Sequence, residues 1–322
     1  MIDMNDIYEK IISIINDYDT IIIMGHKDPD LDSLGSSLGL YEIVESLKKD
    51  AFLFLNDISS YNSNVTEALN KIGKDIKVTN EHKYKLLQGK KLVIITDLHI
   101  QERLEYPNII DEFDVVILDH HIKSKKYIKN SKYIYINSNL SSMSEFVTFF
   151  ADYLNLKLDN VISTIILGGI EIDTNGYNLK TTKDTYLSAS ILMQWGADTL
   201  LKQELLKETK EEYMKRASFI RNSFMINSNT AMCVINGITN SLELAQTAEE
   251  LLNFEDVKAS YVIGRLEDKK IGVSARSIGD IDISKIIKKI GGGGHSGNAA
   301  AQISFKSVKE VQKEIIELIN KR

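Results

Sequence analysis

Short apolar runs alternate with amphipathic segments through about the first 190 residues of the chain. The runs are rich in β-branched residues and have the length of buried strands. They are residues 21–24, 92–96, 115–118 and 133–136. Residues 34–48 and 142–156 have the apolar spacing of helices. Because strands that alternate with helices form βαβ units, the pattern predicts an α/β domain with a parallel sheet.

Helical spacing continues after this region, and a second set of strands follows it. Residues 160–172 predict a buried helix that ends at Asp173, and residues 196–227 read as charged amphipathic helices without a core-like strand. Further strands are expected at 230–235, 259–264, 271–275 and 299–305, and further helices at 241–252, 283–290 and 308–320. We therefore predict a first domain over residues 1–195, a helical connector over 196–227 and a smaller α/β domain over 228–322.

Composition places the chain among ordinary globular proteins. Its 322 residues are 43% hydrophobic, which suits two domains with buried cores. A formal net charge of −6 argues against a protein that coats long nucleic acid. The single Cys233 excludes a disulfide framework and a cysteine zinc cluster within the chain, and it suits the reducing cytoplasm. No apolar run approaches the roughly 20 residues of a membrane span, and no signal peptide is visible at the start.

Residue types that ligate metals follow three of the apolar runs. The first run leads into His26, Asp30 and Asp32, the second into Asp97, and the third into Asp119-His120-His121. Carboxyl ends of parallel strands share one edge of a sheet, so these side chains are expected to lie together. Carboxylate oxygens and imidazole nitrogens suit Mn²⁺ or a similar divalent ion. Asp30 and Asp32, two positions apart, could serve neighbouring ions.

Each segment also has a structural explanation. Asp30 could cap the following helix, Asp97 could simply end a strand, and residues 173–176 could form a helix end and a turn. Two adjacent histidines beyond a buried strand, His120 and His121, are harder to explain by packing. The conjunction of four such segments favours a metal site.

A glycine run marks the second domain. Residues 291–294 are four glycines followed by His295, and they lie between a predicted helix and a predicted strand, where a flexible linker is not expected. Glycines let backbone N–H groups approach an anion closely. Arg276, near the end of a predicted strand, offers a bidentate fork to a phosphate. The segment therefore predicts an anion site.

Together these motifs resemble the DHH family of phosphoesterases followed by the DHH-associated domain, over nearly the whole chain. The motifs are His26-x-x-Pro29-Asp30-x-Asp32-x-x-Gly35-Ser36, Asp97, Asp119-His120-His121, Asp173-Thr174 and Gly291-Gly292-Gly293-Gly294-His295. Residues 24–27, 195–199, 206–209 and 271–277 are most similar to the catalytic half of GdpP-type cyclic-di-AMP phosphodiesterases. After the aspartate that corresponds to Asp97, that type commonly has Thr-His and a basic residue, whereas here Leu98-His99-Ile100 follows. This difference bears on a substrate contact near position 100 and not on the metal site.

The resemblance implies two Mn²⁺ ions. One would be held by His26, Asp30 and Asp97, and the other by Asp32, Asp97, His120 and Asp173, with Asp97 bridging them. Asp97 and His121 would then be the catalytic residues. Asp97 would bridge the ions, and His121 would orient or protonate the substrate without binding metal. The resemblance also implies that the substrate lies in a cleft between the domains and that the associated domain holds it through Arg276, Gly293, Gly294 and His295.

We accordingly expect a manganese-dependent phosphodiesterase that converts cyclic-di-AMP or linear pApA to pApA or AMP. The first alternative is the nano-RNase type of the family, which degrades short RNAs and dephosphorylates 3′-phosphoadenosine 5′-phosphate. A manganese-dependent inorganic pyrophosphatase would carry a different second domain. A non-catalytic nucleotide sensor would not need the full ligand set. The expected partners are a cyclic dinucleotide or a short oligoribonucleotide, with a homodimer as a candidate assembly and with neither long nucleic acid nor membrane.

Overall fold

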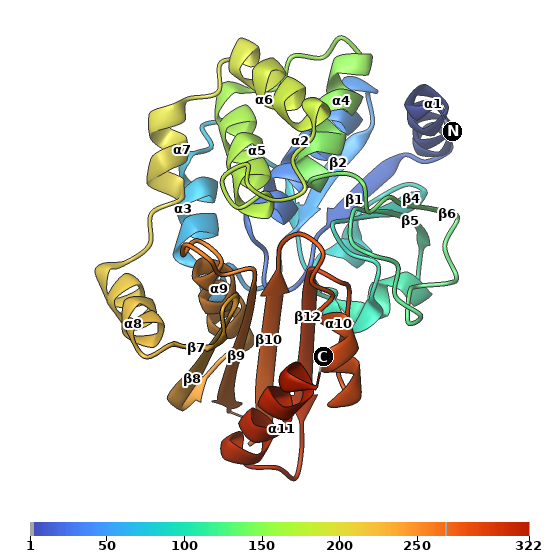
Figure 1. Cartoon of the computed structure of the whole chain (residues 1–322). Coiled ribbons are helices and arrows are strands. Elements are labelled where there is room, and N and C mark those ends of the chain that lie inside the picture. Colours follow the sequence, from blue (N-terminus) through green and yellow to red (C-terminus); the bar gives the residue numbers. More distant parts are fainter. Residues whose placement is uncertain (1–2, 268, 322) are drawn as a thin grey trace. The chain divides into compact units, whose positions relative to one another are not determined.

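The computed structural model describes residues 3–267 and 269–321. The chain divides into two compact units, Met1–Lys207 and Glu208–Arg322, and Figure 1 labels most of their helices and strands. The predicted connector, residues 196–227, is shared between them. Its helix α7 (Thr199–Leu205) belongs to the first unit, whereas α8 (Lys210–Arg221) belongs to the second.

A six-stranded sheet forms the centre of the first unit, in the order β3-β2-β1-β4-β5-β6. Its strands are β1 (Thr20–Met24), β2 (Asp50–Phe54), β3 (Val78–Thr79), β4 (Lys91–Thr96), β5 (Asp114–Asp119) and β6 (Tyr133–Ile136). Every pairing between neighbours is parallel, so the predicted α/β class with a parallel sheet is confirmed. Strand order reverses beside β1, because β2 and β3 extend to one side of it and β4 to β6 to the other. Open α/β sheets bind ligands at such a reversal, beyond the carboxyl ends of the strands.

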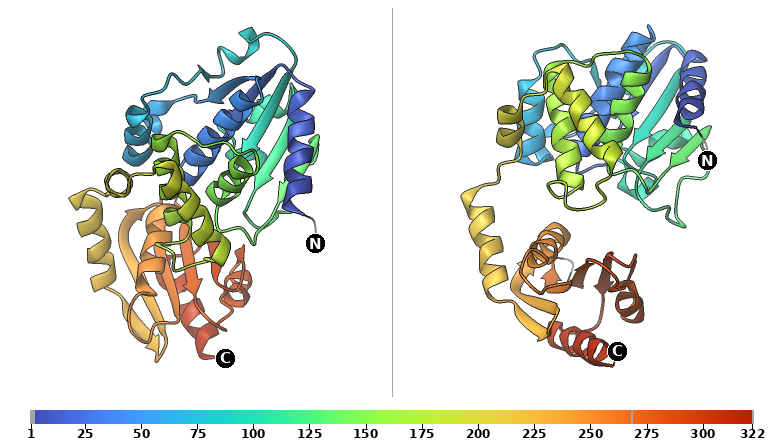
Figure 2. Two further views of the ribbon diagram at one scale, coloured as in Figure 1. Left: turned by 90° about the horizontal axis from the view of Figure 1, so that it is seen from above. Right: turned by 45° about the horizontal axis from the view of Figure 1, so that its top comes forward.

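The helices of the first unit lie on one side of this sheet, where they pack on the strands or on one another. They are α1 (Met4–Asn16), α2 (Leu31–Ser46), α3 (Ser63–Lys71), α4 (Met143–Tyr153), α5 (Asn160–Asp173), α6 (Lys183–Trp195) and α7. Ile21 and Ile23 of β1 are buried in one cluster with Leu38 of α2 and Ile166 of α5. Alternate residues of the strands enter a second cluster, which is completed by short 3₁₀ turns between residues 84 and 111. Helices α2, α4 and α5 pack on one another and lie side by side in Figure 2.

The second unit has its own six-stranded sheet, in the order β11-β12-β10-β9-β8-β7. Its elements are β7 (Phe224–Asn227), β8 (Thr230–Thr239), α9 (Ser241–Leu251), β9 (Ala259–Leu266), β10 (Ile271–Ser277), α10 (Ser284–Lys289), β11 (Gly293–Gly294), β12 (Asn298–Ile303) and α11 (Val308–Asn320). Only β8 and β9 pair in parallel, so the sheet is mixed. The sequence did not mark β7, because this edge strand has mostly exposed side chains and hence no core pattern. Within the described ranges, no helix combines the length and the apolarity that a membrane span requires.

Candidate metal centre

The segments after β1, β4 and β5 converge at one edge of the first sheet. The three strands are neighbours, with Met24 paired to Ile95 and Thr96 paired to Leu118, so their carboxyl ends are level. Side chains from these segments, together with Asp173 at the end of α5, form three groups in which the potential ligand atoms lie within 4.8 Å of one another. The groups are His26, Asp30 and Asp97; Asp32, His120 and Asp173; and Asp97, His120 and His121. All six residues predicted as ligands therefore belong to a group, as does His121.

The first turn of α2 positions two of the carboxylates. Asp30 caps the helix, because its Oδ1 accepts hydrogen bonds from the backbone N–H of Asp32 at 2.9 Å and of Ser33 at 3.0 Å. The capping role and the place in the cluster therefore coexist. Asp32 accepts from the N–H groups of Met143 at 2.9 Å and Ser144 at 2.7 Å, where α4 begins. The amino end of α4 thus favours a negative charge on Asp32.

Asp173 enters the cluster because α5 approaches α2 very closely. A Cβ on Gly169 would lie 2.8 Å from the Cα of Asp32, and a Cβ on Gly35 would lie 3.0 Å from the Cα of Ile166. No larger side chain fits the first position without displacing backbone. The two glycines therefore allow the end of α5 to place Asp173 beside His120, whose Nε2 is 2.9 Å from its Oδ2.

Asp97 is central to the arrangement. Its φ of 62° lies in the left-handed region, which aspartate tolerates better than most residues. Its carboxylate lies 3.4 Å from His26 Nε2, 3.2 Å from His120 Nε2 and 3.4 Å from His121 Nδ1. A single backbone position therefore presents one carboxylate to three imidazoles.

The electrostatics show a shortage of positive charge. Burial, together with Asp97 and Asp173, raises the pKa of Asp30 to about 6. Burial and the same pair of neighbours raise the pKa of Asp32 well above its usual range. Burial alone would lower the pKa of His120, but the carboxylates of Asp173 and Asp97 outweigh it and raise that pKa well above its usual value. Asp30 and Asp32 therefore hold a proton more strongly than an exposed aspartate does.

Several buried polar atoms of the cluster lack a hydrogen-bond partner. They are Asp97 Oδ1 and both ring nitrogens of His120, whose close contacts to carboxylates do not have hydrogen-bond geometry. Leaving such atoms unpaired is costly. A divalent cation would satisfy oxygen and nitrogen donors together, so the side chains present fit a metal site.

One residue of this region was missed by the sequence analysis. His99 is buried and contacts Asp119 through Nδ1, and Asp119 is also 2.8 Å from His121 Nδ1. Burial opposes it, but His121 and His99 together lower the pKa of Asp119, so this residue is a carboxylate. The available signal was a histidine between the apolar Leu98 and Ile100, directly after a strand.

The predicted substrate residues lie in the second unit. Arg276 on β10 donates from Nη1 to Ser274 Oγ and to the carbonyl of Ala275, both at 3.1 Å. Burial lowers the pKa of its guanidinium, and Glu249 opposes this effect. His295 is exposed, and its backbone N–H donates to the carbonyl of Asn298 at 2.7 Å.

Gly293 and Gly294, both predicted to hold substrate, differ in the space that a side chain would have. Gly294 has a φ of +135°, and a Cβ there would lie 2.4 Å from the Cα of Ala299 on β12. Strand pairing therefore explains this glycine. At Gly293 an added Cβ would meet nothing within 4 Å among the described residues. Of the two, Gly293 is the one beside open space.

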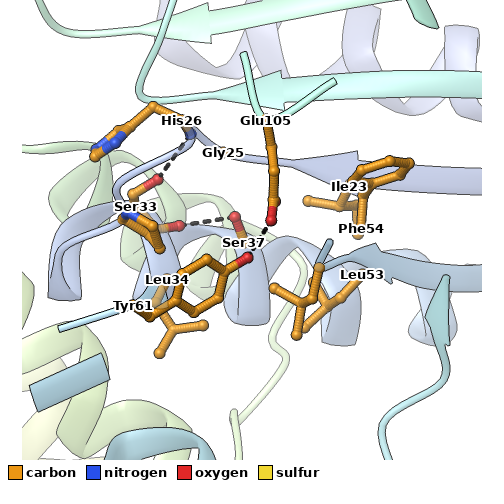
Figure 3. Close-up of a pocket in the computed structure, with 12 residues that line it drawn as sticks. Ile23, Gly25, His26, Ser33, Leu34, Ser37, Leu53, Phe54, Tyr61 and Glu105 are labelled. Carbon is orange, nitrogen blue, oxygen red and sulfur yellow. Dashed lines mark hydrogen bonds between the residues drawn. The ribbon is translucent and has the colours of Figure 1, made fainter. Parts of the chain in front are cut away.

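A small cavity lies next to His26, and Figure 3 shows its lining. The backbone N–H of His26 donates to Ser33 Oγ at 3.4 Å, and the hydroxyl of Tyr61 donates to Glu105. The cavity measures about 20 Å³. This volume suits a water molecule and excludes a nucleotide.

Comparison with known families agrees with this architecture. Residues 20–170 match the DHH family, N-terminal domain, and residues 227–321 match the DHHA1 domain. The chain belongs to the DHH family and carries a DHHA1 domain.

Individual relatives refine the comparison. The chain is 34% identical to "Cyclic-di-AMP phosphodiesterase GdpP" of Geobacillus thermodenitrificans over 95% of its own length, and it spans about half of that relative, 48%. It is 27% identical to "Bifunctional oligoribonuclease and PAP phosphatase NrnA" of Bacillus subtilis over 91% of this chain and 92% of the relative. An exopolyphosphatase-related protein from Bacteroides fragilis shares the fold, with a TM-score of 0.79 at 17% identity over 98% of this chain and 97% of that chain.

Proposed function

We propose that the chain is a manganese-dependent phosphodiesterase that acts on cyclic-di-AMP, on linear pApA, or on both. The observation that carries this proposal is the overlap of the three groups, since Asp97 and His120 each belong to two of them. Shared ligands are what a pair of neighbouring ions requires.

In this proposal one ion is held by His26, Asp30 and Asp97, and the other by Asp32, Asp97, His120 and Asp173. Four carboxylates carry a formal charge of −4, which two divalent ions balance. The site can then accept an anionic phosphodiester, which four bare carboxylates would repel. Metal loading therefore precedes productive substrate binding.

Bound divalent ions supply Lewis-acid stabilisation of phosphoryl charge and lower the pKa of a water molecule. The remaining work belongs to the side chains. Asp97 fixes the spacing of the ligand groups because its carboxylate contacts the imidazoles of His26 and His120. His121 is half-exposed, and its Nδ1 contacts Asp119 at 2.8 Å, so Nε2 at the outer edge of its ring is free to orient a substrate group, or to protonate a substrate oxygen once it carries a proton itself.

The substrate class rests on the relatives. The GdpP relative is named a cyclic-di-AMP phosphodiesterase, and its match to this chain covers 95% of the chain. Arg276 and His295, with the open backbone at Gly293, have the chemistry to hold a second phosphate or a base. We assign the substrate-holding role to these residues and to Gly294.

The test compares rates on cyclic-di-AMP, pApA, a five-nucleotide RNA and 3′-phosphoadenosine 5′-phosphate, with Mn²⁺, with Mg²⁺ and after chelation. We expect the two adenine dinucleotides to be hydrolysed fastest and Mn²⁺ to be required. Purified protein that loads manganese but leaves every one of these substrates intact would rule out the proposal.

The second candidate is an oligoribonuclease that also dephosphorylates 3′-phosphoadenosine 5′-phosphate. One observation favours it, namely that the NrnA relative matches this chain over 92% of its own length. In the same experiment, faster cleavage of the five-nucleotide RNA and of 3′-phosphoadenosine 5′-phosphate than of the cyclic dinucleotide would select this candidate.

A further inference from the structure

The segment that carries His120 and His121 has little regular structure of its own. It follows β5 and runs to residue 132 without a helix or strand, apart from an isolated bridge between Ile100 and Tyr127. Residues beside Asp97 hold this segment in place. The N–H of Ile128 donates to the carbonyl of His99 at 2.9 Å, and the N–H of Ser124 donates to the ring Nε2 of His99 at 2.9 Å.

The Ser124 contact determines which tautomer a neutral His99 ring adopts. A backbone N–H can only donate, so Nε2 of His99 must present its lone pair. In a neutral ring the proton then lies on Nδ1, which contacts Oδ2 of Asp119. His99 therefore contacts residues on both sides of the two histidines, Asp119 before them and Ser124 after them.

Asp119 transmits this constraint to His121. Its other oxygen, Oδ1, accepts the backbone N–H of His121 at 2.9 Å and lies 2.8 Å from the Nδ1 of the same residue. Because Oδ1 of Asp119 already acts as an acceptor toward this backbone N–H, Nδ1 of His121 is the donor in the second contact to the same oxygen. The alternative partner of Nδ1, Asp97 Oδ1, is farther away at 3.4 Å. The Nε2 atom of His121 is thus the one left for a substrate.

We propose that His99 is a positioning residue that acts through Asp119, fixes the ring orientation and tautomer of His121, and keeps the Nδ1 atom of His121 bonded to Asp119 and not to Asp97. The role of His121 in hydrolysis rests on the proposed function, whereas the tautomers do not. A buried imidazole could also serve only to hold the loop, and the tests must separate these roles.

The first test uses three substitutions and one control. Asparagine at 99 can place an amide donor near the position of Nδ1, whereas glutamine extends beyond it and alanine has no donor. We expect His99→Ala and His99→Gln to lower kcat about ten- to a hundredfold, as is typical when a group that orients an active-site residue is lost. KM and manganese stoichiometry should stay at wild-type values, and His99→Asn should recover most of kcat. The control His82→Ala removes an exposed histidine of the same unit and should change nothing.

Wild-type kcat in folded His99→Ala would overturn the proposal, as would a His99→Gln variant that is faster than His99→Asn. Loss of manganese in all three variants would show that His99 supports the metal ligands instead of positioning His121. This result would also overturn the proposal. Circular dichroism confirms that the variants compared are folded.

The second test does not depend on activity. Histidine-selective ¹⁵N NMR of the metal-free protein and of the Mg²⁺-loaded protein, which avoids paramagnetic Mn²⁺, reads the tautomers directly. We expect His99 and His121 both to be protonated at Nδ1 in the wild type, and His121 to populate both tautomers in His99→Ala. An Nε2-protonated His99, or a His121 spectrum that does not respond to His99→Ala, contradicts the proposal. If the wild type hydrolyses no substrate, the proposed function fails while this measurement still decides the positioning role.

Discussion

The two units present polar side chains in opposite ways. At the carboxyl edge of the first sheet, the cluster is buried and under-satisfied, because Asp97 Oδ1 and both nitrogens of His120 lack hydrogen bonds. In the second unit, Arg276 has bonds to Ser274 and Ala275, and His295 lies at the surface. Unpaired carboxylate and imidazole atoms gathered in one buried cluster suit a cation, whereas the guanidinium of Arg276 and the exposed ring of His295 suit an anion. This contrast supports our proposal that the first unit binds metal and the second unit binds substrate.

Substitution of Asp97 should give the largest effect. Asp97→Ala removes a carboxylate that two of the groups share, so hydrolysis should fall by more than about a hundredfold, beyond the loss typical of a residue that merely supports a ligand. Metal content should fall with it, as measured by elemental analysis. The control Asp111→Ala removes an exposed carboxylate of the same unit. Near wild-type turnover in Asp97→Ala would break the assignment of metal binding to the first unit.

Arg276→Ala should reduce activity without removing metal. Loss of a charge-assisted hydrogen bond to phosphate costs about 1.5–3 kcal/mol, which is about ten- to a hundredfold in kcat/KM. His295→Ala should act in the same direction. Hydrolysis of bis-p-nitrophenyl phosphate, which needs only the metals, should suffer much less. Arg265→Ala, an exposed arginine at the other end of the neighbouring strand, is the matched control. If hydrolysis of the small ester and of the dinucleotide fell equally, the proposal that the second unit binds substrate and the first binds metal would be wrong.

Chelation should destabilise one unit selectively. An ion that binds only the folded state stabilises it by about 2.7 kcal/mol at 100 times Kd. For a unit of this size that corresponds to about 5–10 °C in Tm. Differential scanning calorimetry with and without Mn²⁺ should show the shift in the first unit, and Asp97→Ala should reduce it. If neither chelator nor Mn²⁺ changes the Tm, the proposed metal site in the first unit is wrong.

Metal affinity should also depend on pH. The pKa of Asp30 is raised to about 6, so below that value the metal-free unit holds a proton that the ion must displace. Affinity should therefore weaken as pH falls through about 6, about tenfold per unit for one displaced proton. The raised pKa values of Asp32 and His120 extend this dependence above pH 6. Titration calorimetry should show a shallower slope in Asp30→Asn, and a constant affinity between pH 5 and 7 would be incompatible with these shifts.

The sequence by itself determined the class of fold and the identity of the cluster. Four β-branched runs and the helical spacing between them define a parallel sheet, and its carboxyl ends must meet at one edge. His26, Asp97 and His120 could therefore be grouped before any contact was known. The four glycines followed by a histidine likewise predicted an anion site at residues 291–295, because glycines inside a compact unit let backbone N–H groups approach an anion closely.

Only the tertiary structure decided how the cluster is completed. The approach of α5 to α2 depends on the space at Gly169, which no local pattern reports. The contact between His99 and Asp119 joins two strand ends 20 residues apart, so neither hydrophobic period nor capping signal could reveal it. The edge strand β7 was missed for a related reason, since its exposed side chains carry no burial pattern. Periodicity records which face of an element is buried, whereas the partner across that face is set by packing of segments distant in the chain.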